Sequence, residues 1–337
     1  MTKRYSHWGI FTLALSALLI LAVIVSLSSG EINIKLADLP GIFRSKEGMD
    51  YMVLTKIRLP RLLLGIAVGG GLSLSGAILQ GIYRNPLVEP YTLGISGGAA
   101  LGVAIAIVFG LHATFGSMVL PLFGFFGAIA ILFLVYFLGA RKQKLNINNM
   151  LLIGVMVSFV SSSAMMFLMS ITTSDNIHSI VFWIMGSLNE SNSALVKVAL
   201  FTSLSGLVTA YLLAQPLNAL RLGESKAKHL GINTNVAVKI LFVVASLLTG
   251  IAVSVAGVIG FVGLVIPHLI RLIIGNDYRV LLLGSFLGGA TFLIFCDTLA
   301  RTVIAPVELP IGVITGFIGG IVFIVVLSRS GSKLKFS

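Results

Sequence analysis

Charged residues are scarce in this chain, and acidic residues are the scarcest. Eleven Asp and Glu and 23 Lys and Arg make up only 10% of its 337 residues, whereas soluble domains carry roughly 25% charged residues. With 57% hydrophobic residues and a mean hydropathy of +1.06, the chain has too little polar surface to cover a water-soluble particle. The composition therefore predicts an integral membrane protein with lipid as its main solvent.

Cysteine is nearly absent too. Cys296, inside an apolar run, is the single one, so neither an intrachain disulfide nor a thiolate metal site can form. We expect no metal and no cofactor on this chain. The phosphate-binding pattern G-x-x-x-x-G-K-[ST] is also missing. We therefore expect a protein that is not itself an enzyme, and any ATP and Mg²⁺ would be used by another polypeptide.

Long apolar runs, in contrast, are abundant. A bilayer core needs about 20 apolar residues per helix, and the sequence predicts ten such spans, at 8–28, 61–82, 95–111, 117–140, 149–172, 193–214, 237–258, 261–275, 280–300 and 311–328. The first follows Lys3 and Arg4 as a signal peptide would, but it exceeds the usual 7–15 apolar residues and lacks an A-x-A site. We expect it to be retained, giving an all-α polytopic membrane protein with a single transmembrane domain over 1–337.

The basic residues lie almost entirely on one side of these spans. With ten spans both termini share a side, and placing them inside collects 15 cations and 3 acids there, against 8 of each outside. Lys and Arg favour the cytoplasmic side of membrane proteins. We therefore expect cytoplasmic N- and C-termini. This distribution accounts for the net charge of +12, so we expect no nucleic-acid partner.

The spans contain small residues and few charges. Gly65, Gly69, Ser73 and Gly76 share one helix face in the second span, a pattern typical of close helix packing in membranes. Asp297 and Arg301 stand four apart and can pair. Ion-coupled transport usually needs buried acids, so their near absence argues against a secondary transporter.

One enzyme hypothesis arises from the stretch "GISGG" at 94–98, which contains the Gly-x-Ser-Gly pattern of rhomboid-type proteases. Ser96 would be the nucleophile and His178 or His268 its base. Such short patterns occur readily in a chain with 37 glycines, so a flexible helix start is the favoured interpretation.

The longest polar loop on the inner side, 216–235, predicts two short amphipathic helices joined at a glycine. Leucines alternate there with charges, and Gly223 and Gly231 interrupt the pattern. Helices of this kind lie on a membrane surface or dock into a partner.

Four long stretches, taken together, resemble the permease subunits of the FecCD family, the iron-chelate and cobalamin importers of ABC type II. They are "RLPRLLLGIAVGGGLSLSGAILQGIYRNPLVEPYTLGISGGAALG" (58–102), "LNALRLGESKAKHLGIN" (217–233), "GVIGFVGLVIPHLIRLIIGNDYRVLLLGS" (257–285) and "DTLARTVIAPVELPIGVITGFIGGIVFIVVL" (297–327). The resemblance implies a bacterial or archaeal cytoplasmic-membrane location. It also implies a homodimer, two ATP-binding subunits, and a periplasmic or lipid-anchored substrate-binding protein.

The resemblance also implies roles for individual residues. Loop 216–235 would couple to the ATPase through Leu217, Leu220, Arg221, Gly223, Glu224, Lys228 and Gly231. Ser158, Ser162 and Met166 would line the translocation pathway, for which helix packing is the alternative explanation. Asn148 and Asn149 would form the cytoplasmic gate, although small hydroxyl residues are the family's usual choice.

Three arginines near the outer span ends, Arg58, Arg61 and Arg301, match the positions at which the family docks acidic residues of the binding protein. The alternative is snorkelling, with apolar stems buried and cationic heads in water. The cargo stays open between iron-siderophore, haem or cobalamin chelates and molybdate- or tungstate-type oxyanions. A channel or secondary transporter without ATP coupling is the alternative from another class.

Overall fold

A computed structural model describes residues 2–30, 34–141, 144–145, 147–190 and 192–330. The described chain is helical apart from a two-residue antiparallel pairing of β1 (Ala140–Arg141) with β2 (Lys144–Leu145). The helical elements, in chain order, are α1 (Thr2–Ser28), η1 (Leu36–Asp38), α2 (Leu39–Ser45), α3 (Met49–Met52), η2 (Val53–Arg58), α4 (Leu59–Tyr83), η3 (Pro90–Leu93), α5 (Ile95–Val108), α6 (Leu111–Phe115), α7 (Val119–Gly139), α8 (Ile147–Ile171), α9 (Ser174–Met185), α10 (Ser193–Leu212), α11 (Ala214–Leu220), α12 (Glu224–His229), α13 (Thr234–Ala256), α14 (Val262–Ile274), α15 (Tyr278–Thr302) and α16 (Ile311–Ser330).

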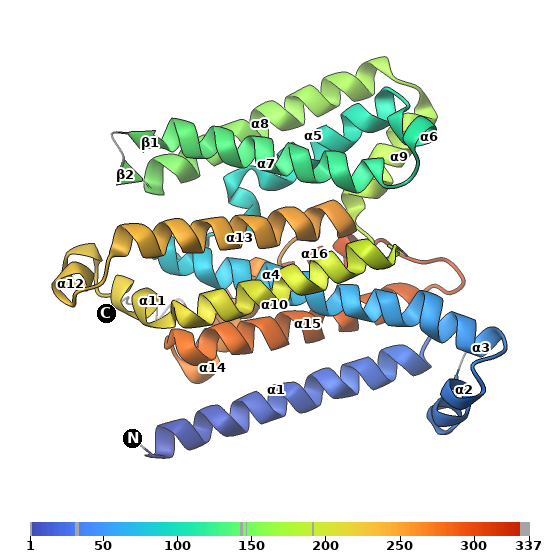
Figure 1. Cartoon of the computed structure of the whole chain (residues 1–337), viewed down its shortest axis with the longest axis horizontal. Coiled ribbons are helices and arrows are strands. Elements are labelled where there is room, and N and C mark those ends of the chain that lie inside the picture. Colours follow the sequence, from blue (N-terminus) through green and yellow to red (C-terminus); the bar gives the residue numbers. More distant parts are fainter. Residues whose placement is uncertain (1, 31–33, 142–143, 146, 191, 331–337) are drawn as a thin grey trace.

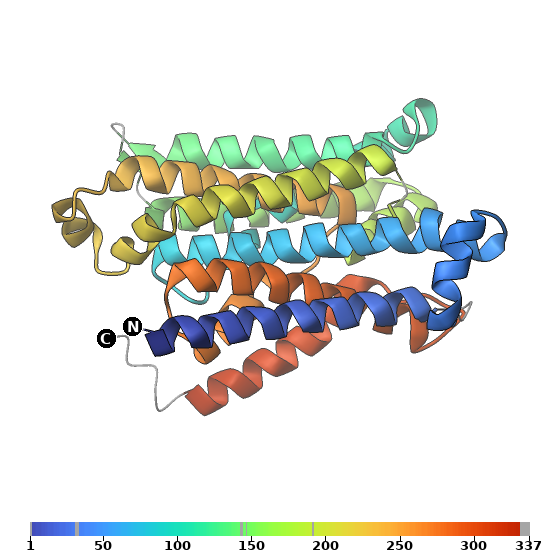
Figure 2. The same ribbon diagram turned by 60° about the horizontal axis from the view of Figure 1, so that its bottom comes forward.

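The long helices run roughly side by side along one axis (Figures 1 and 2). Among the described residues, eight helices are long and apolar enough to cross a membrane, and α5 and α14 are shorter apolar helices. These ten overlap the ten spans predicted from the sequence. The 12-residue helix α9 was not predicted.

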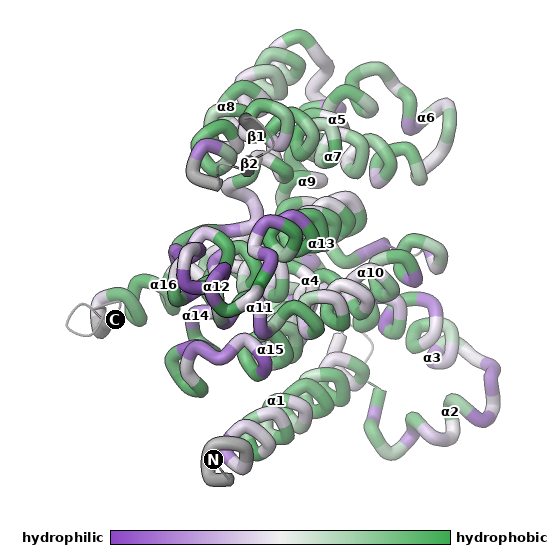
Figure 3. The backbone as a smooth tube through the Cα atoms, turned by 60° about the vertical axis from the view of Figure 1, so that its left-hand side comes forward, coloured by the Kyte–Doolittle hydropathy of each residue, from purple (hydrophilic) through white to green (hydrophobic). Residues whose placement is uncertain are grey.

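The bundle has two distinct ends. At one, called here the α12 end, lie the start of α1, the paired strands β1 and β2, and α12; at the other, the α3 end, lie α2, α3 and α6 (Figure 1). Viewed from the α12 end, hydrophilic stretches gather at α11, α12 and the turn between α14 and α15 (Figure 3). The start of α1 and the end of α16 lie at the same end (Figure 2), in agreement with the even number of spans.

Helix α4 is the axis of the bundle. It packs against α10, α13, α14 and α15, and 89% of its most apolar window is buried. A Cβ atom on Gly69 would overlap the carbonyl of Gly289, and one on Gly76 would overlap that of Gly263. The predicted packing role of the small residues in this span is therefore confirmed: glycine lets the backbones approach until they touch.

Pro60 lies inside a continuous helix, although proline is common in the first turn of a helix. Helix α3, the π-helical η2 and α4 form one continuous helix over Met49–Tyr83. Proline has no N–H to donate and crowds the preceding turn. The backbone accommodates it by widening that turn, so the N–H of Leu59 reaches five residues back to Leu54.

The two short apolar helices begin where two connections meet, one containing the short η3 and the other lying just before α14. The hydroxyl of Tyr91, just before α5, donates to the carbonyl of Ile259 at 3.0 Å and accepts from its N–H at 3.1 Å. Glu89 accepts from the N–H of Phe261, just before α14, at 3.1 Å. Irregular backbone within a membrane protein is tolerated when protein groups satisfy it in this way.

Candidate functional site

Three arginines gather at the α3 end. Arg58 ends η2, Arg61 lies in the first turn of α4, and Arg301 lies in the last turn of α15. Their exposed fractions are 5%, 7% and 9%. Snorkelling, with the cationic heads in water, is therefore wrong for all three, because the guanidinium groups are enclosed by protein.

Asp297 orients two of these arginines. Its Oδ1 accepts from Nε of Arg61 at 2.6 Å, and its Oδ2 accepts from Nε of Arg301 at 3.0 Å. The pairing of Asp297 with Arg301 predicted from their spacing is confirmed. Asp297 itself is only 3% exposed. A buried carboxylate shared between two guanidinium groups fixes both in place.

The arginines also hold the end of α1. Arg301 donates to the carbonyl of Ser29 at 3.1 Å and to the hydroxyl of Ser26 at 2.9 Å, while Arg58 donates to the carbonyl of Leu27. The last carbonyls of a helix have no partner within the helix and carry partial negative charge. The arginine side chains thus cap α1 from neighbouring helices.

Glu308, on the connection from α15 to α16, completes this group and was missed in the sequence. Both of its carboxylate oxygens lie 3.0 Å from Nη1 of Arg61, and Oε2 accepts from Nδ2 of Asn189 at 3.2 Å. Its side chain is 43% exposed. Burial alone would raise the pKa of Glu308, but the charge and hydrogen bond of Arg61 hold it below the ordinary value. Arg58, Arg61, Asp297, Arg301 and Glu308 are called the arginine cluster below.

At the α12 end, loop 216–235 folds as predicted into two short helices joined at a glycine. α11 and α12 meet at Gly223, whose φ of +102° favours glycine. Leu217 and Leu220 on α11 are buried, at 0% and 6% exposed, whereas Leu230 beyond α12 is 63% exposed. One helix is embedded in the bundle and the other stands away from it.

Polar contacts fasten α11 to the turn before α15. Asn218 donates to Asp277 at 3.0 Å and accepts from the N–H of Tyr278 at 3.0 Å, and Arg221 donates to the carbonyl of Asn276 at 2.8 Å. Hydrogen bonds from Arg279 and Asn218 lower the pKa of Asp277 to about 2, against the opposing effect of its burial. The contacts join α11 to α15 as one unit.

The charges of α12 remain in water. Glu224 and Lys228 pair at 2.7 Å with side chains 56% and 54% exposed. Beyond α12, Gly231 has a φ of +76° and no heavy atom within 4 Å of an added Cβ. α12 is therefore a short helix with exposed charges, bounded by two glycines with positive φ.

The proposed pathway residues on α8 do not share one exposed face. Ser158 is partly buried and donates to the carbonyl of Gly154 at 3.0 Å; Ser162 is also partly buried, and Met166 is 66% exposed. Residues spaced by four drift around a helix of 3.6 residues per turn, which explains the difference. The open face carries Met156, Phe159, Val160, Ser163, Met166, Phe167 and Ser170.

Asn148 and Asn149 lie in the first turn of α8, at the α12 end. Asn149 is exposed, while the side chain of Asn148 falls outside what the structure describes.

The proposed serine-protease pair is not assembled. Ser96 lies in the first turn of α5, while His178 contacts Phe182 and His268 contacts Phe323, with ring centroids 4.4 and 6.0 Å apart. Among the described residues, no hydrogen bond links Ser96 to either histidine.

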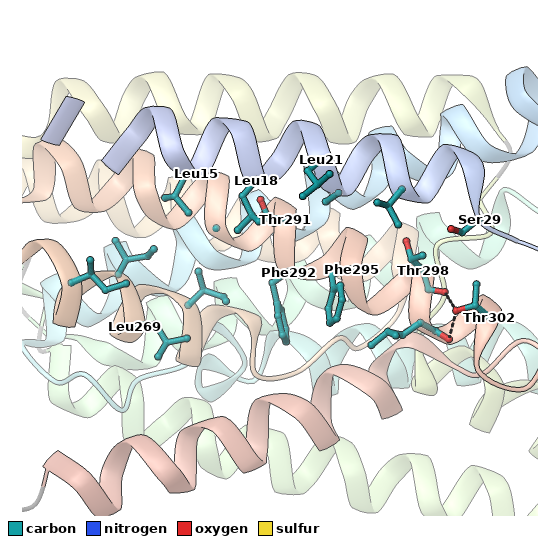
Figure 4. A pocket seen from close by; sticks show the side chains of 17 residues that line it. Leu15, Leu18, Leu21, Ser29, Leu269, Thr291, Phe292, Phe295, Thr298 and Thr302 are labelled. Carbon is teal, nitrogen blue, oxygen red and sulfur yellow. Dashed lines mark hydrogen bonds between the residues drawn. The ribbon is translucent and has the colours of Figure 1, made fainter. Parts of the chain in front are cut away.

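A cavity of about 780 Å³ lies between α1, α14 and α15 (Figure 4). Its wall is mainly leucine, isoleucine and phenylalanine, including Leu18, Phe292 and Phe295. The hydroxyls of Thr298 and Thr302 are turned to backbone carbonyls at 2.8 and 2.7 Å. Such a lining suits hydrocarbon rather than a polar solute.

The described helices define the class of protein: an all-helical membrane protein with several helices that can cross the bilayer. Residues 18–329 match the FecCD transport family, and the chain belongs to that family.

Individual relatives cover nearly the whole chain. The hemin transport system permease protein HmuU of Yersinia pestis is 39% identical, over 94% of this chain and 96% of its own length. The vitamin B12 import system permease protein BtuC of Klebsiella pneumoniae is 38% identical, over 99% and 97%. A solved structure titled as an inward-facing putative metal-chelate type ABC transporter superposes with a TM-score of 0.83 at 32% identity, over 96% of this chain and 99% of that one. The fold is that of a type II ABC importer permease.

Proposed function

We propose that this chain is the permease subunit of a binding-protein-dependent ABC importer. It passes a chelate of the iron-siderophore, haem or cobalamin class across the cytoplasmic membrane. The observation that carries this proposal is the match along 94–99% of the chain to permeases for hemin and vitamin B12. The chain binds no cofactor of its own, and a separate ATPase drives transport.

The α12 end faces the cytoplasm in this proposal. Two copies of the chain form the pathway, and each copy engages one ATP-binding subunit through loop 216–235. The support is that the charged side chains of α12 are exposed, while α11 is fastened to α15. A displacement of α12 can therefore reach a membrane-spanning helix through α11.

The pathway follows the open face of α8 in the dimer, with Asn148 and Asn149 at its cytoplasmic end. Serine hydroxyls and methionine side chains on this face, including Ser163 and Met166, give a weakly polar wall. Methionine is flexible and polarisable, so such a wall lets a bulky chelate slide without binding it tightly.

The α3 end receives the substrate-binding protein, with Arg58, Arg61 and Arg301 meeting its carboxylates. Arginine suits this role because its planar fork matches a carboxylate. In the undocked chain all three are enclosed, so docking requires rearrangement at the surface of the arginine cluster rather than simple approach to free cations.

Charge reversal tests the docking proposal. Arg61→Glu should slow association with the binding protein encoded beside this permease, and wild-type association should weaken as salt rises. Arg44→Glu is the matched control, since Arg44 is exposed at the same end outside the cluster. Equal effects of the two reversals would reduce docking to net charge and contradict the assigned role of Arg61.

Uptake assays in proteoliposomes identify the cargo class. The binding protein and ATPase are supplied, and labelled ferric siderophore, haem, cobalamin and molybdate are compared. Uptake of molybdate alone would contradict the chelate assignment.

A further inference from the structure

We propose that Glu308 is a built-in competitor for the carboxylate of the incoming binding protein. It occupies Arg61 while the chain is undocked and gives way when a partner carboxylate arrives. This inference rests on the proposed docking of a substrate-binding protein at the α3 end, and it assigns the exchange to one residue.

The contact itself resembles the one a partner would make. Glu308 offers both carboxylate oxygens to Nη1 of Arg61 at 3.0 Å. It comes from the connection between α15 and α16, not from a helix packed around Arg61. A carboxylate on a surface connection therefore already fills the position that a docking Glu or Asp needs.

The two acids of the arginine cluster differ in their freedom to leave. The side chain of Asp297 is 4% exposed, and it binds Arg61 and Arg301 at once; the side chain of Glu308 is 43% exposed. Removing the partner of a buried charge is strongly unfavourable, whereas pairs open to solvent are weak and exchangeable. Asp297 is thus the fixed positioning residue and Glu308 the replaceable one.

Replacement keeps Nη1 of Arg61 paired throughout. When Glu308 leaves, Asp297 still holds Nε of Arg61, but Nη1 of this side chain, which is 7% exposed, would be costly to leave without a carboxylate. With Glu308 in place, an approaching carboxylate exchanges one ion pair for another, so the net gain is small and docking stays reversible. The same exchange rejects partners that bring no carboxylate to this position.

The decisive prediction is whether Glu308→Gln strengthens or weakens association with the binding protein. Glu308→Gln removes the competing charge but keeps the shape of the side chain. It should strengthen association with the co-encoded binding protein by about 2- to 5-fold, the scale of an exposed ion pair. Glu47→Gln is the matched control, because it makes the same change in net charge at an exposed residue of the same end, and no hydrogen bond or ion pair among the described residues joins Glu47 to the cluster.

A second readout needs no binding protein. Phenylglyoxal, which modifies arginine side chains, is applied to the reconstituted permease, and the modified Arg61 peptide is quantified by mass spectrometry. Arg61 should react faster in Glu308→Gln and in Glu308→Ala than in wild type, and at the wild-type rate in Glu47→Gln. Only variants that elute as folded protein in size-exclusion chromatography are compared.

The outcomes separate this inference from the docking proposal. If Arg61→Glu leaves association unchanged, docking at this site fails and the competitor role fails with it. If Arg61→Glu weakens association but Glu308→Gln also weakens it, Glu308 assists docking and the competitor role alone is overturned. Equal gains in Glu308→Gln and Glu47→Gln overturn it as well, since net charge then explains both. Faster binding together with faster labelling of Arg61, in Glu308→Gln only, supports it.

Discussion

The arginine cluster at the α3 end is largely buried, whereas the charges of α12 at the other end are exposed to solvent. At the α3 end, three arginines with exposed fractions of 9% or less are matched to carboxylates and to the end of α1. At the α12 end, Glu224 and Lys228 pair in water on a helix of six residues.

Under the proposed function, this difference predicts two kinds of partner contact. A partner at the α3 end must exchange with contacts that already exist, because the arginines are satisfied within the chain. A partner at the α12 end meets a projection that is already displayed and needs no internal bond to open. The first arrangement favours reversible recognition, and the second favours a lasting mechanical connection.

The largest expected effect, on the stability of the fold, comes from removing the carboxylate of Asp297 from the arginine cluster. Asp297→Ala leaves Arg61 and Arg301 without their shared buried carboxylate, and such losses cost about 3–5 kcal/mol. We expect a large fall in thermal stability of the purified protein. Glu308→Gln is the comparison and should cost less than about 1 kcal/mol. Similar losses in the two variants would contradict the division into a fixed and a replaceable acid.

Replacing one glycine by proline at each end tests whether only the α12 end couples ATP hydrolysis to uptake. Gly223 has a φ of +102° and donates its N–H to Leu220 at 3.0 Å, so Gly223→Pro disrupts the junction of α11 and α12. Uptake should fall at least about tenfold while ATP hydrolysis by the assembled transporter continues. Gly110→Pro makes similar local damage at the α3 end, where Gly110 has a φ of +66°, and should leave coupling intact. Wild-type uptake in Gly223→Pro would exclude the coupling role.

Cysteine labelling tests whether the open face of α8 lines a water-accessible pathway between the two ends. Single cysteines at Ser163 and Met166, in a Cys296→Ala background, should react with a charged thiol reagent. A cysteine at Ser161, which is 2% exposed, should react about tenfold more slowly, because burial blocks approach of the reagent. Reaction of all three with lipid-soluble reagents only would assign this face to the lipid.

The smallest effect is the pH dependence contributed by Asp277. Its pKa is lowered from 3.8 to about 2 in the folded chain, first of all by Arg279. A group whose folded pKa is depressed stabilises the fold above its unfolded value and loses this contribution as the pH falls. Asp277→Asn should therefore be less stable than wild type at pH 7, by on the order of 1 kcal/mol.

The difference between these two proteins should shrink as the pH falls from about 4 toward 2, as followed by denaturation in detergent. Asparagine is an equally good helix N-cap, so the substitution keeps the cap and removes the charge together with the acceptor for Nη2 of Arg279. A constant difference across this range would contradict the assignment.

Most of the fold could be predicted from the sequence, because bilayer thickness turns hydropathy directly into helix positions. The ten spans were predicted to within a few residues. The 12-residue α9 and the continuation of α4 back to Met49 were not. The apolar part of α9 is too short to stand out as a span, and Pro60 normally marks a helix start.

The sequence located the candidate site residues along the chain, but it could not predict how deeply they are buried or which distant residues they contact. Arg58, Arg61 and Arg301 were found from their motif, yet burial depends on which helices enclose a side chain. Glu308 could not be connected to Arg61, since 247 positions separate them. The pairing of Asp297 with Arg301 was predictable because helical geometry alone brings together residues four apart.

Helix α15 is bonded through Asp277 to α11 at one end, and through Arg301 to the end of α1 at the other. Its 24 intervening steps make a rod of roughly 36 Å, and glycine contacts with α4 along its length leave it little room to bend. A tilt of about 5° around the Asp277 end would carry Arg301 sideways by roughly 3 Å. A hydrogen bond tolerates only a fraction of that displacement. A tilt of α15 by a few degrees at the α12 end is thus enough to change the hydrogen bonds that Arg301 makes at the α3 end.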